Sequence, residues 1–151
     1  MKQPSVGIIC GSKSDLSRVE KAALQLKEFG IKNDITVASA HRTPDKVASY
    51  SRKAEKKYDL IIACAGMAAA LPGVVAGHTT LPVIGVPLSS PVLGGQDSLY
   101  AIVQMPTGVP VATVAIDGTK NAAILAAQIL SLKYPQVKKS LKAFKTKLAK
   151  K

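Results

Sequence analysis

The chain has 151 residues, of which 47% are apolar, 20% charged and only 4% aromatic, and it contains no tryptophan. This length and composition are typical of one globular domain with a sizeable core. The formal net charge of +12 is uneven, because residues 133–151 hold eight lysines and no acid while the rest of the chain carries only +4. No apolar run reaches the ~18 residues that a membrane-spanning helix needs.

The N-terminus leads straight into a predicted strand and shows no secretory signal pattern. Cys10 and Cys64 lie within or at the end of apolar runs and have no metal-type spacing. They are therefore interpreted as small buried hydrophobic residues and not as a disulfide framework. A reduced, cytoplasmic protein is expected.

Short apolar runs alternate along the chain with segments of helical periodicity. Strands are predicted at residues 6–10, 35–38, 60–64, 82–87 and 111–116. Helices are predicted from Leu16 to Gly30, from a Thr43 cap to Tyr58, after the small-residue turn 65–73, at 98–105 and at 119–132. This alternation predicts an α/β fold, a flavodoxin-like three-layer doubly wound parallel sheet.

The last segment has a different composition. Val137, Leu141, Phe144 and Leu148 recur at helical spacing, and lysine fills most other positions. We therefore divide the chain into a domain at residues 1–134 and a basic amphipathic C-terminal helix at residues 135–151. Since the sequence shows nothing obvious inside the domain for this helix to cover, we expect it to pack on a neighbouring subunit. Nucleic-acid binding is the less favoured alternative, because aromatic residues for base stacking are few.

The segment from Gly11 to Asp15 lies between a strand and a helix. Its glycine and hydroxyls, with the first free amides of the helix, suit a phosphate, while Asp15 suits ribose hydroxyls. A plain capped turn is the alternative. The turn at residues 65–73 offers a similar choice, because its small side chains suit either close approach of a planar ligand or tight helix packing.

His41 and Arg42 follow the second predicted strand and stand at a strand-to-helix turn, where open parallel sheets bind ligands. Histidine changes charge near neutral pH, and arginine binds phosphate or carboxylate through two hydrogen bonds. The alternative is a histidine bonded to backbone beside a solvated arginine. The other histidine, His78, is predicted to be a solvated loop residue.

Several motifs, taken together and in order, resemble the PurE family of purine biosynthesis, whose members are 5-(carboxyamino)imidazole ribonucleotide mutases. The resemblance covers residues 5 to about 132. It is carried by these stretches: residues 11–15, 39–44, 65–66 with 71–73, 82–87, 97–99, 102–106 and 108–116.

The resemblance implies an octamer of flavodoxin-like subunits that needs no metal and no organic cofactor. It implies that a carboxylate moves from the exocyclic nitrogen of an aminoimidazole ribonucleotide to ring carbon 4, through loss and recapture of carbon dioxide. His41 matches the general acid/base. The matched substrate-binding positions are Ser12, Asp15, Ser39, Arg42, Ala65, Gly66 and Leu71.

One position departs from the bacterial pattern of this family, G-x-A-H-L-P-G. Ala70 stands where that pattern has a histidine, and alanine can neither donate a hydrogen bond nor carry charge. The related branch, aminoimidazole ribonucleotide carboxylase, fixes free carbon dioxide and departs in this same loop. We favour the mutase, with the direct carboxylase and a non-catalytic nucleotide-binding module as alternatives.

Overall fold

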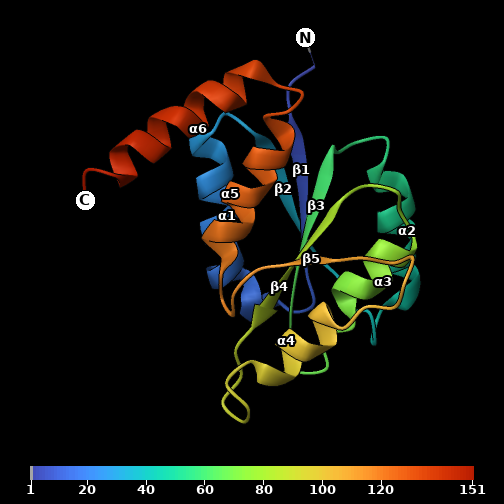
Figure 1. The fold of residues 1–151 in the computed structure, drawn as a ribbon. Coiled ribbons are helices and arrows are strands. Elements are labelled where there is room, and N and C mark those ends of the chain that lie inside the picture. Colours follow the sequence, from blue (N-terminus) through green and yellow to red (C-terminus); the bar gives the residue numbers. More distant parts are fainter. Residues whose placement is uncertain (1) are drawn as a thin grey trace.

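The computed structural model describes residues 2–151, which form one five-stranded parallel sheet with helices on both faces (Figure 1). The strand order is β2-β1-β3-β4-β5, the order of the flavodoxin-like fold. The strands are β1 Ser5–Cys10, β2 Lys32–Val37, β3 Leu60–Gly66, β4 Val83–Leu88 and β5 Ala112–Thr113. The helices are α1 Leu16–Glu28, α2 Pro44–Ala54, α3 Leu71–Gly77, α4 Gln96–Val103, α5 Thr119–Leu130 and α6 Pro135–Leu148, with a 3-10 turn at Lys13–Asp15. The predicted fold class is confirmed.

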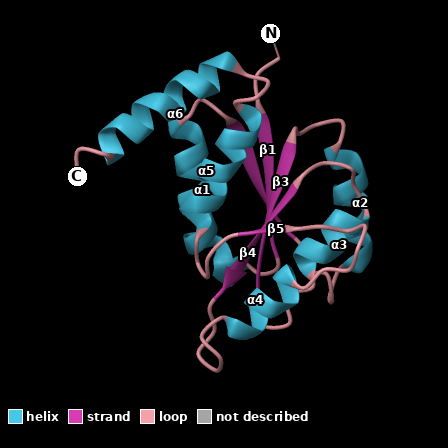
Figure 2. Ribbon diagram, in the orientation of Figure 1, coloured by secondary structure: helices cyan, strands magenta, loops and turns pink. Residues whose placement is uncertain are grey.

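Two hydrophobic clusters, one on each face of the sheet, form the core. Helices α1 and α5 cover one face, and α2, α3 and α4 cover the other (Figure 2). The central strands β1 and β4 are buried along their whole length, as expected for strands covered on both faces. Their largely apolar sequences are therefore explained by the position of these strands in the interior of the sheet.

The strand predicted at residues 111–116 is reduced to two residues in the structure, β5. Pro87 of β4 gives a physical reason. Proline has no N–H group to donate to a neighbouring strand, and the Pro87 carbonyl accepts its hydrogen bond from the amide of Asp117 at 2.8 Å. Regular pairing of β4 with β5 therefore stops at Gly85 and Thr113.

Helix α6 packs on its own domain. Val137 and Leu141 are buried in the same cluster as α1 and α5, and the rings of Phe144 and Phe29 meet edge to face with centroids 5.4 Å apart. The reason given for expecting a neighbouring subunit, that the domain leaves nothing for this helix to cover, was therefore wrong. Docking of a neighbour on the rest of α6 stays a prediction, since Leu148 remains half exposed.

Cys10 and Cys64 are free and buried, and they lie opposite each other on β1 and β3. Burial, with a contribution from Asp15, raises the pKa of the Cys10 thiol to about 11. Both thiols therefore act as small apolar side chains at neutral pH, as predicted. Along residues 2–151, no helix has both the length and the apolar character that crossing a membrane requires.

Candidate active site

A cleft of about 730 Å³ lies at the carboxyl ends of β1, β2, β3 and β4. The cleft includes the boundary between β1 and β3, where the strand order reverses; open α/β sheets bind their ligands at such a point. Every predicted site residue lines this cleft: Ser12, Asp15, Ser39, His41, Arg42, Ala65, Gly66 and Leu71. The structure thus brings together residues that come from three separate loops.

The loop after β1 supplies hydroxyls and one buried carboxylate. The Ser12 Oγ caps the 3-10 turn by accepting the amide of Ser14 at 3.3 Å, and the two hydroxyls lie 2.9 Å apart. Asp15 is only 9% exposed, and its carboxylate accepts a hydrogen bond from Arg18 at 2.9 Å. The segment is therefore a capped turn, as the alternative interpretation stated, and it also lines the cleft.

The loop after β2 is held by its own hydrogen bonds. Three hydrogen bonds join Ser39 and Thr43. The Thr43 hydroxyl accepts the Ser39 amide at 2.9 Å and donates to the Ser39 carbonyl at 3.1 Å, and the Thr43 amide donates to the same carbonyl at 2.8 Å. The side chain of Thr43 is thus used inside the loop and does not cap α2, contrary to the prediction. The Arg42 amide donates to the Ser39 Oγ at 3.1 Å. This frame presents an exposed His41 side chain at the cleft.

The loop after β3 forms a wall of small side chains. Met67 and Ala69 both have positive φ values, 54° and 37°, a backbone region that favours glycine and costs other residues about 1–3 kcal/mol. A Cβ added at Gly66 would lie 3.3 Å from the Leu88 carbonyl oxygen. Ala70 precedes α3 and makes no side-chain cap. The strained turn and the missing side-chain bulk keep this part of the cleft open and mostly apolar.

Three further polar residues of the cleft were missed by the sequence analysis: Arg18, Ser89 and Ser90. The Arg18 guanidinium donates to Asp15, to the Ser89 carbonyl at 3.1 Å and to Asp117 at 3.2 Å. Only the spacing of Asp15 and Arg18, one helical turn apart, was visible in the sequence. The other contacts span 71 and 99 residues and have no local signal.

Asp117 completes this arrangement from the turn before α5. Its carboxylate accepts the Ser89 amide at 3.0 Å and the Ser89 hydroxyl at 2.5 Å. Burial alone would raise the pKa of Asp117, but the hydrogen bonds from Ser89 and the charge of Arg18 outweigh it and lower that pKa below its ordinary value. Asp117 is therefore ionised at neutral pH and holds Ser89 in place.

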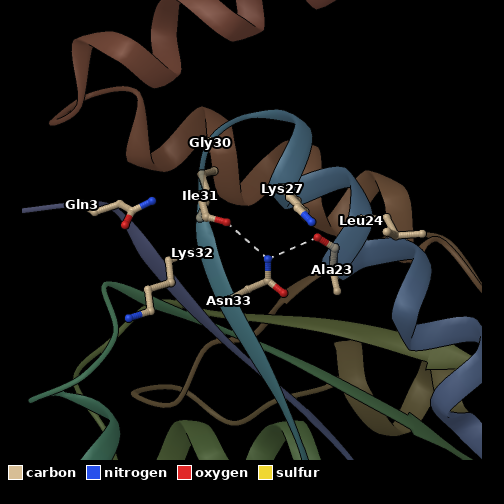
Figure 3. A pocket seen from close by; sticks show the side chains of 8 residues that line it. All are labelled: Gln3, Ala23, Leu24, Lys27, Gly30, Ile31, Lys32 and Asn33. Atoms are coloured by element: carbon tan, nitrogen blue, oxygen red, sulfur yellow. Dashed lines mark hydrogen bonds between the residues drawn. The ribbon is translucent and has the colours of Figure 1, made fainter.

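Two features lie away from the cleft. His78 ends α3, where its Nδ1 is 2.8 Å from the Val74 carbonyl oxygen; the ring is half-buried and so less solvated than predicted. A second hollow, of about 430 Å³, lies at the opposite end of β2 beside the end of α1 (Figure 3). Its Asn33 amide is already bonded to two carbonyl oxygens of the chain, Ala23 and Ile31, each at 3.2 Å. None of the predicted site residues lines this hollow.

The fold and the cleft define a flavodoxin-like α/β protein with a nucleotide-sized site at the carboxyl end of its sheet. A model of the family described as AIR carboxylase matches residues 5–151, and the chain belongs to that family. It is 56% identical to an N5-carboxyaminoimidazole ribonucleotide mutase of Pyrococcus horikoshii over 95% of this chain and 81% of that protein. It is 52% identical to a phosphoribosylaminoimidazole carboxylase of Schizosaccharomyces pombe over 95% of this chain but only 26% of that protein.

A solved structure gives the same result. The crystal structure of Treponema denticola PurE superimposes with a TM-score of 0.90 at 37% sequence identity, covering 98% of this chain and 93% of that one. The family and the fold implied by the sequence motifs are thereby confirmed.

Proposed function

We propose that the chain is a 5-(carboxyamino)imidazole ribonucleotide mutase of purine biosynthesis, an isomerase that moves a carboxylate from the exocyclic nitrogen to ring carbon 4. The observation that supports it best is the convergence of His41, Arg42 and Asp15 on one cleft, in a chain with mutase relatives at 56% identity. These residues supply a proton carrier, an anion clamp and an acceptor for ribose hydroxyls.

Substrate binding is assigned by the chemistry of each loop. Arg42 and the Ser12 and Ser39 hydroxyls would take the phosphate, because guanidinium and hydroxyl donors suit its oxygens. Asp15 would accept hydrogen bonds from the ribose. Ala65, Gly66 and Leu71 would lie along the base, since the buried side chains of Ala65 and Leu71 present a surface from which water is excluded.

His41 is the proposed general acid/base. Protonated, it would give its proton to the exocyclic nitrogen as the nitrogen–carbon bond breaks and carbon dioxide is released. Ring carbon 4 then attacks the trapped carbon dioxide, and His41 takes the proton that carbon 4 loses, which returns the imidazole to its starting state. A cleft that excludes water favours recapture over escape.

The direct carboxylase is the second candidate, and Ala70 is the observation that favours it. Ala70 lines the cleft without a polar side chain, and the Schizosaccharomyces pombe relative named as a carboxylase is nearly as similar as the mutases. Turnover should be measured side by side with the carboxyamino ribonucleotide alone and with aminoimidazole ribonucleotide plus bicarbonate. We expect the first to be the better substrate; a preference for the second would overturn the mutase assignment.

We further propose a homo-oligomer, an octamer by the resemblance, that works in the cytoplasm. Exposed apolar side chains near the cleft support a covering subunit: Met67 is 63% exposed, Val92 82% and Leu93 55%. Sedimentation of the purified chain tests this proposal, and a monomer at micromolar concentration would contradict it.

A further inference from the structure

Ser89, the first residue after β4, is held through all of its polar groups. Its amide and hydroxyl both donate to Asp117, and its carbonyl accepts from Arg18. Arg18 belongs to α1, and Asp117 precedes α5. These hydrogen bonds hold the chain that follows β4 against α1 and against the turn before α5, at the edge of the cleft. They also fix the position of the next residue, Ser90.

Ser90 lines the cleft, yet its Oγ is buried and has no hydrogen-bond partner among residues 2–151. The contrast with Ser98 is clear, because the buried Ser98 hydroxyl has two carbonyl oxygens within reach, those of Leu88 at 2.9 Å and Gly95 at 3.0 Å. A buried hydroxyl without a partner destabilises a fold and calls for an explanation. A hydrogen bond from the Ser90 hydroxyl to a bound ligand would be such an explanation.

We propose that the Ser90 hydroxyl donates a hydrogen bond to the carboxylate carried by the bound ribonucleotide, an inference that rests on the proposed function. A carboxylate only accepts hydrogen bonds, so a hydroxyl donor suits it. Serine moves between three staggered rotamers, and a rotation about χ1 turns its hydroxyl toward the ligand.

The order of the strands explains why the carboxylate, and not the phosphate, is the partner. Neighbouring strands lie about 4.8 Å apart, so Arg42 after β2 and Ser90 after β4 are separated by three strand spacings, roughly 14 Å. With the phosphate at Arg42 and the ribose at Asp15, the base lies over the β3 loop. The substituents of the base then face the β4 end, where Ser90 stands.

Two ribonucleotides that differ only by this carboxylate test the inference: 4-carboxy-5-aminoimidazole ribonucleotide and 5-aminoimidazole ribonucleotide. In Ser90→Ala, calorimetry should show Kd raised about 10-fold or more for the carboxylated compound, the scale of a hydrogen bond to a charged group. Kd for the other compound should stay within about twofold of wild type. Ser90→Thr should restore the preference. Ser140→Ala, at a half-exposed position of α6 outside the cleft, should leave both constants unchanged.

Thermal unfolding separates this role from a structural one. Removing an unpartnered buried hydroxyl should leave the Tm of Ser90→Ala equal to or above that of wild type, although binding weakens. Equal losses for both ribonucleotides, no loss for either, or a lower Tm with an unchanged preference would each overturn the inference. If Ser90→Ala does not fold, Ser90→Cys replaces the hydroxyl with a weak donor of similar size and gives the same comparison.

The test also distinguishes failure of the inference from failure of the proposed function. A wild-type chain that binds both ribonucleotides but does not convert the carboxyamino ribonucleotide would overturn the function. The binding ratio of Ser90→Ala would still test the role of Ser90. A wild-type chain that binds neither would overturn both. Normal turnover with an unchanged ratio in Ser90→Ala would overturn the inference alone.

Discussion

The Arg42 guanidinium donates a hydrogen bond to the Gly11 carbonyl oxygen at 3.1 Å and so joins the loop after β2 to the loop after β1. One nitrogen of the side chain orients it, and its remaining donors are available to an anion. Because phosphate suits a guanidinium in two-point geometry, this pair places a cation where the hydroxyls of Ser12 and Ser39 also lie.

Replacing Arg42 by Gln should therefore weaken binding of the ribonucleotide. We expect KM to rise about 10- to 100-fold, since charged hydrogen bonds of about 1.5–3 kcal/mol are lost, while the nucleoside without phosphate should bind equally to variant and wild type. Titration of both compounds checks this. Arg52→Gln, on the exposed side of α2, is the control, and an equal effect from the two variants would argue against a phosphate site.

The two histidines of the chain allow a matched comparison. His41→Asn should lower kcat by about 10²- to 10⁴-fold, the contribution of a general acid/base, with little change in ribonucleotide affinity. His78→Asn, outside the cleft at the end of α3, should keep kcat near wild type. Steady-state kinetics measure both, and near-normal turnover by His41→Asn would contradict the proposed mechanism.

Ala70→His adds an imidazole to the wall of the cleft. If the chain is a mutase, the new donor should raise the rate with the carboxyamino ribonucleotide by about 10-fold, which corresponds to one modest hydrogen bond to a charged group. It should not improve turnover of aminoimidazole ribonucleotide with bicarbonate. Ala101→His, exposed on α4, is the control. A higher rate of Ala70→His only with aminoimidazole ribonucleotide plus bicarbonate would favour the direct carboxylase.

Substitution of Leu141 tests how much the packing of α6 contributes to the stability of the domain. This side chain is 8% exposed, so Leu141→Ala should lower the free energy of unfolding by about 2–4 kcal/mol. Lys142→Ala, at the exposed neighbouring position, should change the free energy of unfolding by less than about 0.5 kcal/mol. Urea denaturation of both variants decides, and equal stabilities would mean that the helix detaches in solution.

Asp34 gives a pH prediction at the opposite end of the sheet. Burial tends to raise the pKa of Asp34, but hydrogen bonds from Lys57, 2.7 Å away, and from Tyr58 lower it below its ordinary value. The stability gained is then complete above the unfolded pKa of about 3.9 and is lost as the pH falls through the lower folded pKa.

Unfolding from pH 7 to pH 2 tests this prediction. Asp34→Asn should be less stable than wild type at pH 7. The difference should shrink as the pH falls below ~4 and through the lower folded pKa of Asp34, because the carboxyl then takes up a proton. Glu20→Gln, exposed on α1, should leave the pH dependence unchanged. A constant difference between Asp34→Asn and wild type across this range would show that the ion pair contributes nothing.

The fold could be predicted because its signals are local. Apolar runs such as that of β3 are near-continuous in the sequence, and Pro44 and Gly30 mark helix boundaries that the structure keeps within a few residues. The length of β5 could not be predicted, since it depends on Pro87 in a strand that precedes it by more than twenty residues. Likewise, the packing of α6 depends on Phe29, which is 115 residues away in the sequence.

The same distinction applies to the cleft. His41 and Arg42 are recognisable from their neighbours in the sequence, and the structure places them together with Asp15. Arg18 contacts Asp117 and Ser89 only because the assembled sheet brings the segments after β1, β4 and β5 together. Tertiary structure was needed to find these residues, because an arginine on a helix usually faces solvent.

The two outer strands affect how the protein behaves when it is concentrated. A border strand with free amides and carbonyls can recruit a foreign strand and start aggregation. Here one border begins with Lys32, Asn33 and Asp34, and the other offers only Ala112 and Thr113. Neither is a good template for adding a strand, so contacts between copies of this chain should form through helices and loops, and the sheet should not grow sideways.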